Sequence, residues 1–444
     1  MSRNVIPQAD ADGDGVFSAI TSGNPLDFRL AVAPEPNALF DGYGRLRISA
    51  PVTVWDGSFV AANNGTLRWH AQVTGSGAVD TATNPRATLT TSGAGLAIFQ
   101  SRRVVTYQPA KSTTVFISGT LCTSAPTAGG TNAYFGYARA PAGVSVPTSG
   151  VVFLRRSTGM KVAITRDTGT TIVNQAEWNV DTLDGNGPSG LTIDFNFRQI
   201  YYVSFKWLGS GDVELGVIVG QQMRPAHVFS HTNALSPYAY WPSGSQRIYA
   251  ALSTPATEGA LEMVLTCASA ISDGGYTAVG HMFAVTRSAP ATVTVGVPTV
   301  VYSLRIDPAN IHTTVRITSV TSHTTFAAGT DVRVEIWHIL SPQSEGSGSG
   351  LVDQTSAAGW NAVGSSLVQT SEAVIPNAVT NGTADRRVAL DYTSRDVKGA
   401  VAPDNLLVNV DPLGASDIVY VVATAAGGTG TGPIDVAITY EEFN

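Results

Sequence analysis

The stretch IYYVSFKWLGSGDVELGVIVG, residues 200–220, decides how this chain is expected to fold. β-branched, aromatic and other apolar residues fill its two arms, and the polar segment GSGD at 209–212 separates them. Residues of the first kind favour strands, whereas Gly, Ser and Asp favour a turn. The stretch therefore predicts a long β-hairpin.

Strand patterns of this kind extend over residues 45–290. LTIDFNF at 191–197 alternates apolar and polar side chains with a period of two, which indicates a strand. GVVFLRRS at 150–157 and MKVAITRD at 160–167 indicate a strand pair around Thr158-Gly159. Turn-forming pairs recur at Asp56-Gly57, Asn64-Gly65, Asp184-Gly185, Asn186-Gly187 and Asp273-Gly274. Because no long amphipathic helix interrupts them, these strands predict one large β-sandwich of the jelly-roll or lectin-like kind.

The flanking regions have a different character. Residues 1–39 are rich in Pro, Asp, Gly and Asn and lack a helical apolar stripe, so we expect an extended docking arm. TRSAPATVTVGVP at 286–298 predicts a linker into a smaller, jelly-roll-like β-domain. The predicted class is therefore all-β, with an arm at 1–39, a large sandwich at 40–290 and a smaller one at 291–444.

Within the smaller domain, VYSLRI at 301–306, TTVRITSVTS at 313–322 and DVRVEIWHIL at 331–340 predict strands by their alternation. SPQSEGSGSG at 341–350 has the composition of a flexible loop. SDIVYVVATAAGGTGTGPIDVAITYEEF at 416–443 predicts a hairpin whose loop is the Gly/Thr run 426–432. The YEEF segment is expected to end an edge strand, where Glu441 and Glu442 discourage misplaced pairing.

Charge is scarce and unevenly spread. Charged residues make up 13% of the 444 residues, and the net charge is −7. Residues 1–44 have a net charge of −4, residues 45–290 of +5 and residues 291–444 of −8. A positive middle between negative ends would steer contacts between copies, but independent solvation of each part explains it equally well. The small basic excess, with no Lys/Arg run longer than two, argues against nucleic-acid binding.

Two cysteines, Cys122 and Cys267, lie in strand-like, mostly small or apolar contexts. We expect two buried free thiols rather than a disulfide. The N-terminal MSRNVIPQADADGDG lacks a basic segment followed by an apolar core, so no Sec signal is expected. Because no apolar run is long enough to span a bilayer, membrane insertion is not expected and the chain is expected to be made in the cytoplasm.

No metal or cofactor is predicted. DADGDG, with Asp10, Asp12 and Asp14, resembles the start of an EF-hand loop, but the twelfth position is Thr21 instead of Glu. HVFSH spaces His227 and His231 as a helical metal pair would, yet it follows Pro225 in a β-rich region. The glycine runs GSGSG and GGTGTG lack the following helix that a phosphate-binding loop requires.

Enzymatic activity is not expected either. A sandwich of this size suits a glycosidase if two carboxylates face each other across a cleft. Glu177, Glu214, Glu258 and Glu262 are the available carboxylates, but they form no dense acidic strand motif. We therefore predict no catalytic residues.

The segment SPYAYWPSGS at 236–245 clusters Tyr238, Tyr240 and Trp241 beside prolines. Aromatic residues exposed on a loop can stack on a sugar or fill a pocket on a partner protein. Packing in the core or at its rim is the third alternative. The three residues are thus candidates for ligand or partner contact.

Several segments resemble a family of tailed-bacteriophage virion structural proteins. ALFDGYGRLRISAPVTVWDGSF at 38–59 is similar to the family's Phe/Asp–Gly–Arg-Leu-Arg block, and LTCASAISDGGYTAVG at 265–280 to its Cys-x-x-x-x-Ser-(Glu/Asp)-Gly-Gly block, with Asp273 where Glu is commoner. VYSLRI, GWNAVGSSLVQ and SDIVYVVAT…AITYEEF resemble strands of the family's second domain, with Tyr440 in place of a usual Trp. The resemblance spans roughly residues 38–444.

The resemblance implies a non-enzymatic component of a virion, assembled in the host cytoplasm and attached to the head, tail or fibre through its N-terminal arm. Partners implied are other copies, with a trimer favoured, and other virion proteins. A receptor- or carbohydrate-binding appendage on host-surface glycan is the alternative, and a glycan-degrading enzyme is a third reading. Gly42 and Gly44 suit a hinge between the arm and the first strand, so we assign Phe40, Asp41, Arg45 and Arg47 to assembly, with both arginines paired to carboxylates.

Overall fold

A computed structural model of the chain divides into two compact units, Met1–Ile48 and Ser49–Asn444. In the first unit the structure describes only β1 (Gln8–Ala9) and β2 (Phe17–Ser18), which pair antiparallel. In the second it describes residues 51–59, 68–82, 86–109, 111–141, 144, 146–166, 169–232, 239–273, 280–326, 330–339, 361–363, 365–376, 386–393, 398–401, 407–410, 416–428 and 430–443. Most of the predicted arm, the Asp10–Asp14 motif, the 341–350 loop and the assembly residues Phe40, Asp41, Arg45 and Arg47 lie outside the described residues.

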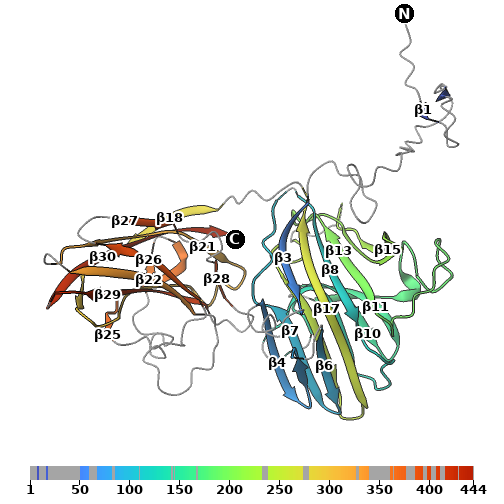
Figure 1. Ribbon diagram of the computed structural model, residues 1–444. Coiled ribbons are helices and arrows are strands. Elements are labelled where there is room, and N and C mark those ends of the chain that lie inside the picture. The colour runs from blue at the N-terminus through green and yellow to red at the C-terminus, as the bar shows by residue number, and fades with distance from the viewer. Residues whose placement is uncertain are drawn as a thin grey trace, which may run out of the picture. The chain divides into compact units, whose positions relative to one another are not determined.

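The fold is all-β, as predicted: a large lectin-like sandwich is followed by a smaller sandwich (Figure 1). The large sandwich has two antiparallel sheets. One has seven strands in the order β12 (Gly169–Asn174), β11 (Gly159–Arg166), β10 (Ser149–Arg156), β9 (Asn132–Arg139), β16 (Arg247–Thr254), β7 (Gly95–Ser101) and β4 (Trp69–Gly75).

The facing sheet has eight strands. Seven follow the order β15 (Gln222–Phe229), β14 (Val213–Val219), β13 (Gln199–Phe205), β8 (Thr113–Thr120), β17 (Ala260–Ser272), β6 (Ala87–Ser92) and β5 (Ala78–Asp80). The eighth, β3 (Val52–Ser58), pairs with β17 beyond the end of β6. A short 3-10 turn, η1 (Gln175–Glu177), follows β12.

Aromatic rings fill the space between these two sheets. Trp69 stacks on Phe99 with 4.7 Å between ring centroids and meets Trp55 edge-on at 5.0 Å. Gly57 makes this packing possible, because a Cβ atom there would lie 2.5 Å from the Trp55 ring and 2.9 Å from Trp69 Nε1. The core thus depends on a few large, closely fitted side chains.

Both predicted hairpins of the large sandwich are confirmed. β13 and β14 pair from Tyr201↔Val217 to Phe205↔Val213, around the GSGD turn. β10 and β11 pair up to Arg156↔Gly159, and Gly159 adopts a positive φ of 103° that suits glycine in the turn.

The predicted strand LTIDFNF is wrong. Residues 191–197 form a loop with one isolated bridge, Asp184↔Thr192. The Asp194 carboxylate accepts a hydrogen bond from the backbone N–H of Asn196 at 2.9 Å, and Phe197 N–H bonds to the Asp194 carbonyl at 3.2 Å. This side-chain capture of the backbone favours a turn over a strand despite the alternating pattern.

The small sandwich also consists of two sheets. The first has the order β18 (His281–Thr286), β30 (Thr431–Phe443), β21 (Thr314–Thr324) and β27 (Lys398–Val401), with β19 (Ala291–Thr294) on β30 and β28 (Leu407–Asn409) on β21. The second has the order β23 (Asn361–Val363), β24 (Ser365–Ser371), β20 (Thr299–Ile306), β29 (Ile418–Ala426), β22 (Asp331–Ile339) and β26 (Arg386–Thr393), with β25 (Ile375–Pro376) on β20. Val and Ile side chains dominate the core between them.

Three expectations for this region need correction. β29 and β30 belong to different sheets, so glycines 427, 428 and 430, all with positive φ, form a crossover and not a hairpin loop. β18 pairs with β30, so the small sandwich begins before residue 291. β30 lies between β18 and β21, so YEEF ends an interior strand, where Glu441 forms an ion pair with Arg316.

The two cysteines differ in environment. Both are free thiols, as predicted, but Cys122 is buried and Cys267 is exposed. Burial raises the pKa of Cys122 to about 12, so this thiol is unreactive at neutral pH. The prediction of two buried thiols is wrong for Cys267, which follows a bulge in β17 that turns its side chain out of the core. Among the described residues, no helix is long and apolar enough to cross a membrane.

Candidate functional site

The aromatic cluster predicted to contact a ligand lies mostly inside the large sandwich. Tyr240 is 4% exposed and Trp241 is 0% exposed, while Tyr238 lies outside the described residues. Trp241 packs edge-on against Phe205 at 5.5 Å, and its carbonyl accepts a hydrogen bond from Trp207 Nε1 at 3.3 Å. Neither Tyr240 nor Trp241 has an exposed ring, so the core-packing alternative holds for these two residues.

The two histidines of HVFSH serve packing as well. His227 lies on strand β15, not on a helix, and accepts a hydrogen bond from Asn179 N–H at its Nδ1 atom (3.3 Å). His231 stacks on Tyr240 with 4.1 Å between ring centroids. Burial lowers the pKa of both imidazoles. The described part of the chain contains no group of three or more His, Cys, Asp or Glu side chains able to hold a metal ion.

Glu258 is a buried carboxylate with a full set of donors. It accepts hydrogen bonds from Thr127 Oγ1 (2.7 Å), the Ala128 N–H (2.9 Å) and Thr131 Oγ1 (2.5 Å). These bonds outweigh the opposing effect of burial and lower the pKa of Glu258 to about 2. A carboxylate held ionised in this way anchors the 127–131 loop and is poorly suited to general-acid chemistry.

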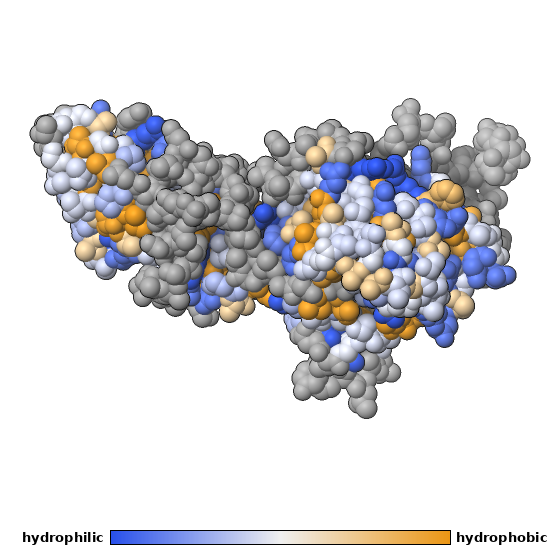
Figure 2. All heavy atoms as spheres, turned by 90° about the horizontal axis from the view of Figure 1, so that it is seen from below, coloured by the Kyte–Doolittle hydropathy of each residue, from blue (hydrophilic) through white to orange (hydrophobic). Residues whose placement is uncertain are grey.

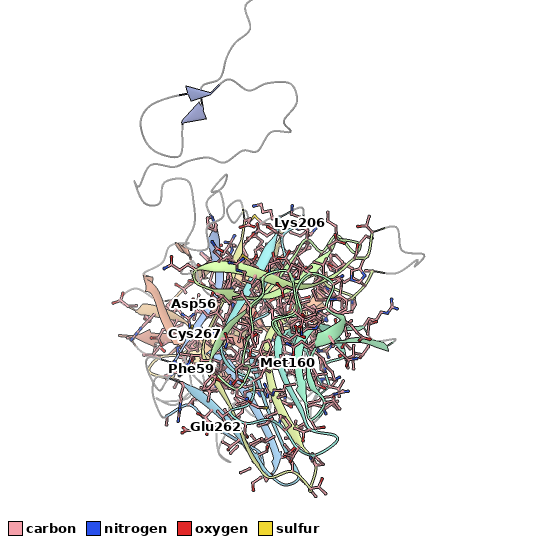
Figure 3. All side chains as sticks on the ribbon, turned by 90° about the vertical axis from the view of Figure 1, so that its right-hand side faces the viewer. Asp56, Phe59, Met160, Lys206, Glu262 and Cys267 are labelled. Carbon is pink, nitrogen blue, oxygen red and sulfur yellow. The ribbon has the colours of Figure 1, made fainter. Side chains whose placement is uncertain are left out.

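The other three acidic candidates lie on three different elements of the large sandwich. Glu214 on β14 accepts a hydrogen bond from the Tyr202 hydroxyl at 2.7 Å. Glu262 lies on β17, the strand that also carries Cys267 (Figure 3). Glu177 accepts from Asn174 Nδ2 at 2.8 Å beside the 3-10 turn η1. Each of Glu177, Glu214 and Glu258 is thus bonded to a different set of partners in the described structure.

A second apolar cluster lies on the face of the seven-stranded sheet that points away from the facing sheet. We call it the outer cluster, and it consists of Leu96, Ile98, Tyr134, Ala138, Ala140, Val152, Leu154, Ala163, Tyr249 and Ala251. Tyr134 and Tyr249 contact each other with 6.2 Å between ring centroids. All ten side chains are buried, with at most 8% of any of them exposed, so this face of the sheet is not open to water.

Polar groups border the outer cluster at its Tyr134 end. Asn132 Oδ1 accepts a hydrogen bond from Arg156 Nε at 2.7 Å, and Asn132 Nδ2 donates to the Gly130 carbonyl at 2.8 Å. Burial raises the pKa of the Tyr134 hydroxyl, while the charge and hydrogen bond of Arg156 oppose that rise. Asn132 and Arg156 are half-buried. These two side chains are therefore the accessible polar groups beside the buried outer cluster.

The sequence contained one signal for the outer cluster. GVVFLRRS has four consecutive apolar residues, Val151 to Leu154, and all four are buried in β10. Successive side chains of a strand point to opposite faces, so the burial of all four means that both faces of β10 are covered. A strand with one face in water would alternate apolar and polar residues instead. Asn132 and Arg156 were missed because their proximity depends on the pairing of β9 with β10.

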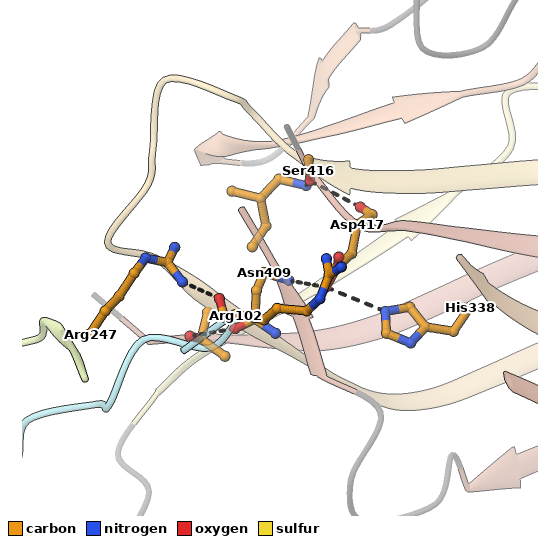
Figure 4. Close-up of polar contacts among 8 residues, drawn as sticks. Arg102, Arg247, His338, Asn409, Ser416 and Asp417 are labelled. Atoms are coloured by element: carbon orange, nitrogen blue, oxygen red, sulfur yellow. Dashed lines mark hydrogen bonds and ion pairs between the residues drawn. The ribbon is translucent and has the colours of Figure 1, made fainter. Parts of the chain in front are cut away.

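Arg247, at the start of β16, is a buried cation bonded to backbone carbonyls. It donates to the carbonyls of Ser101 (3.0 Å), Arg102 and Val410. Next to Val410, Asn409 N–H donates to Asp417 Oδ2 at 3.1 Å, and His338 Nε2 lies 3.6 Å from the same oxygen (Figure 4). The dipoles of these carbonyl groups thus compensate the buried charge of Arg247. Through these bonds Arg247 links β16 of the large sandwich to Val410 of the small sandwich.

No family model matches the chain, and the search of curated proteins finds no match. Solved structures with similar folds include lectins, carbohydrate recognition domains and a glucanase. The carbohydrate recognition domain of Emp47p is 11% identical, with a TM-score of 0.32, and the match covers 51% of this chain and 97% of that chain.

Peanut lectin is 12% identical with a TM-score of 0.31, and the match covers 52% of this chain and all of that chain (100%). An endo-1,3-beta-glucanase from Streptomyces sioyaensis is 10% identical with a TM-score of 0.32, covering 55% of this chain and 100% of the other. At these identities and TM-scores the similarities concern the class of fold and carry no argument about function.

Proposed function

We propose that this chain is a non-enzymatic structural component of a tailed-phage particle, which works as a homo-oligomer attached through its N-terminal segment. The pairing of β3 with β17 is the observation that carries the proposal. These strands contain parts of two of the segments that resemble the virion family, and they pair from Ser58↔Cys267 to Ser272↔Val52. Segments far apart in the sequence are thus direct neighbours in one sheet.

The remaining segments of the resemblance support the same proposal. VYSLRI lies on β20, which pairs with β24 on one side and with β29 on the other. β24 carries SSLVQ and β29 carries IVYVVAT. Within the described residues, these segments of the resemblance therefore lie on paired strands of the sheets, which suits a structural role.

The surface of the body also suits assembly. Charged residues are half as frequent as in ordinary globular domains, at 13% of the chain. Pale, weakly polar residues and small hydrophobic areas cover much of the coloured surface in Figure 2. Met1–Ile48 forms a unit of its own, as an attachment segment would. Neutral surfaces of this kind bury at interfaces with little desolvation cost.

The test is incorporation into particles. A phage whose copy lacks residues 2–36 is expected to contain at least about tenfold less of the chain per purified particle, measured by quantitative mass spectrometry. Circular dichroism and thermal melting of the purified variant control for folding of the body. Undiminished incorporation contradicts attachment through the N-terminal segment. Absence of the wild-type chain from purified particles contradicts the structural role itself.

Carbohydrate binding is the second candidate, and the half-buried Asn132–Arg156 pair favours it. A guanidinium held by an amide offers directed hydrogen-bond donors of the kind that sugar hydroxyls accept. On an array of host-surface glycans, Arg156→Ala is expected to lower binding about tenfold or more. Arg198→Ala, which changes an exposed arginine elsewhere, is the control. Binding unaffected by Arg156→Ala excludes this site.

A further inference from the structure

Three cations gather at the turn end of the β10–β11 hairpin. Arg155 and Arg156 end β10, and Lys161 on β11 pairs with Leu154 of the outer cluster. Side chains of a strand alternate between its faces, so Arg156 and Lys161 share the face of the outer cluster, while Arg155 points to the opposite face. Residues placed diagonally across two neighbouring strands lie about 7–8 Å apart. Arg156 and Lys161 are such neighbours, because Arg156 pairs with Gly159.

An asparagine side chain holds each of these cations. The bonds run from Arg155 to Asn196 at 2.7 Å, from Arg156 to Asn132 at 2.7 Å, and from Lys161 to Asn174. In the described part of the chain, none of the three cations forms an ion pair with a carboxylate. An amide oxygen satisfies a donor and fixes its position, but it carries no charge of its own that would cancel the positive charge.

Lys161 is the unusual member of the group, because only 7% of it is exposed. Lysine side chains are almost never buried to this degree unless an opposite charge pairs with them. Arg247, which is also buried, donates to several backbone carbonyls, whereas Lys161 bonds to one amide oxygen. Within the described structure the charge of Lys161 is therefore poorly compensated and can attract an anion.

Three carboxylates lie near this group, and each accepts hydrogen bonds from neutral donors. Glu177 is exposed and accepts from Asn174 Nδ2 at 2.8 Å. Asp194 accepts from the Asn196 N–H at 2.9 Å, and Glu258 accepts from the 127–131 loop. Only Glu177 contacts an asparagine that holds a cation on the face of the outer cluster. The two cations on that face therefore outnumber it.

Solvent reaches this group at the hairpin turn. Arg156 is half-buried, and Asn174 and residues 157–159 are exposed. A Cβ atom at Gly159, the residue paired with Arg156, would meet no atom within 4 Å. Asn132 and the Tyr134 hydroxyl take only part of the donors of Arg156. The rest of its planar fork suits two oxygens of a carboxylate or sulfate group.

We propose that Arg156 and Lys161 form a binding site for an oxyanion, and that the oxyanion is the carboxylate or sulfate group of an acidic sugar. Arg156 contacts the anion, and Lys161, fixed by Asn174, is a positioning residue that raises the positive potential at the site. The oxyanion site stands independently of the proposed functions, whereas the identity of its carrier rests on the carbohydrate-binding candidate. A neutral sugar would leave both cations without a counter-charge, so acidic sugars are expected to bind more tightly.

Thermal melting of the full chain in inorganic sulfate tests the oxyanion site. When sulfate replaces chloride at equal ionic strength, the Tm of the wild type is expected to rise about 2–4 °C more than that of Lys161→Met or Arg156→Gln. Sulfate also stabilises folded proteins in general, so the difference between the variants is the quantity measured. Lys206→Met and Arg166→Gln are the matched controls, because both residues are exposed away from the site. Both controls are expected to respond like the wild type.

The same melting curves separate a binding site from a structural contact. In chloride, Lys161→Met is expected to melt no lower than the wild type, because methionine removes a buried charge that no carboxylate pairs with. A Lys161–Asn174 bond that serves only the fold would instead make this variant melt clearly lower. The oxyanion site is overturned if the wild type and both site variants respond equally to sulfate.

Binding to an array of defined glycans tests the carrier of the anion. The wild type is expected to bind glycans with a carboxylate or sulfate group about tenfold or more tightly than the same glycans without it. Lys161→Met should reduce this preference to about threefold or less, and added salt should reduce it as well. Equal binding of acidic and neutral glycans overturns the acidic-sugar assignment but leaves carbohydrate binding intact. A retained sulfate response without binding to any glycan supports the oxyanion site and overturns its assignment to a sugar.

Discussion

The two sandwiches fill their cores in different ways. The large sandwich depends on aromatic rings, with Trp69 in contact with Trp55, Phe59 and Phe99. The small sandwich packs mainly Val and Ile side chains, such as Val421 and Ile336, between its sheets. Large rings concentrate packing energy at a few positions, whereas β-branched residues distribute it over many. The difference teaches that the two domains should respond unequally to single substitutions.

Buried carboxylates follow the same division. In the large sandwich, Glu258 accepts hydrogen bonds from hydroxyls and backbone N–H groups of one loop. In the small sandwich, Glu441 forms an ion pair with Arg316 on the neighbouring strand and accepts from the Gly280 N–H at 3.0 Å. The first carboxylate fixes a loop, and the second strengthens strand pairing that already exists. Their removal should therefore cost different amounts.

Truncation of a core residue gives the largest expected difference. Trp69→Ala should lower the free energy of unfolding of the large sandwich by about 3–5 kcal/mol, because the stacked rings leave a cavity. Val421→Ala, fully buried in the small sandwich, should cost about 1–3 kcal/mol. Urea unfolding followed by circular dichroism measures both. Equal losses would remove the proposed contrast between concentrated and distributed packing.

Glu258→Gln should have the next largest effect and should depend on pH. The pKa of Glu258 is depressed from 4.5 to about 2, so its stabilising effect is complete above pH 4.5 and is lost as pH falls toward 2. We expect the variant to be less stable than the wild type by about 2–3 kcal/mol at pH 7, with the difference shrinking below pH 4.5. A pH-independent difference in urea unfolding would show that the charge is not responsible.

Glu441→Gln should have the smallest effect of the three. The amide oxygen still accepts from the Gly280 N–H, and the partly exposed Arg316 regains water in place of its carboxylate. The expected loss is about 1 kcal/mol, and it should diminish in high salt. Thermal melting at low and high ionic strength measures it. A loss as large as that of Glu258→Gln would break the division between loop-fixing and strand-strengthening carboxylates.

The sequence predicted the features that local signals determine. The hairpins β10–β11 and β13–β14 were predicted because turn residues and strand residues lie next to each other in the chain. The all-β class followed from many such signals. In contrast, the pairing of β3 with β17 joins residues about two hundred positions apart, and no local pattern encodes it.

The same limit explains the errors at the candidate site. The sequence left sugar contact, partner contact and core packing open for Tyr240 and Trp241, and only their burial in the folded sandwich selects core packing. Simple alternation would bury Cys267 on the same side of β17 as Met263 and Leu265, but the bulge between Leu265 and Cys267 changes the register and exposes Cys267. The Gly/Thr run predicted the loop of a hairpin, but β30 pairs with β18 and β21 in one sheet while β29 lies in the other. Tertiary pairing thus decided each case.

The position of β30 in its sheet has a consequence for synthesis on the ribosome. β18 and β21 leave the ribosome more than a hundred residues before β30, and both need it as their common neighbour. The large sandwich has all its strands once Ser272 has emerged, so it can fold while translation continues. The small sandwich must wait with unpaired strands until residue 443 emerges. Nascent chains should therefore acquire protease resistance in two steps, and the interval between them is when the chain is most exposed to aggregation.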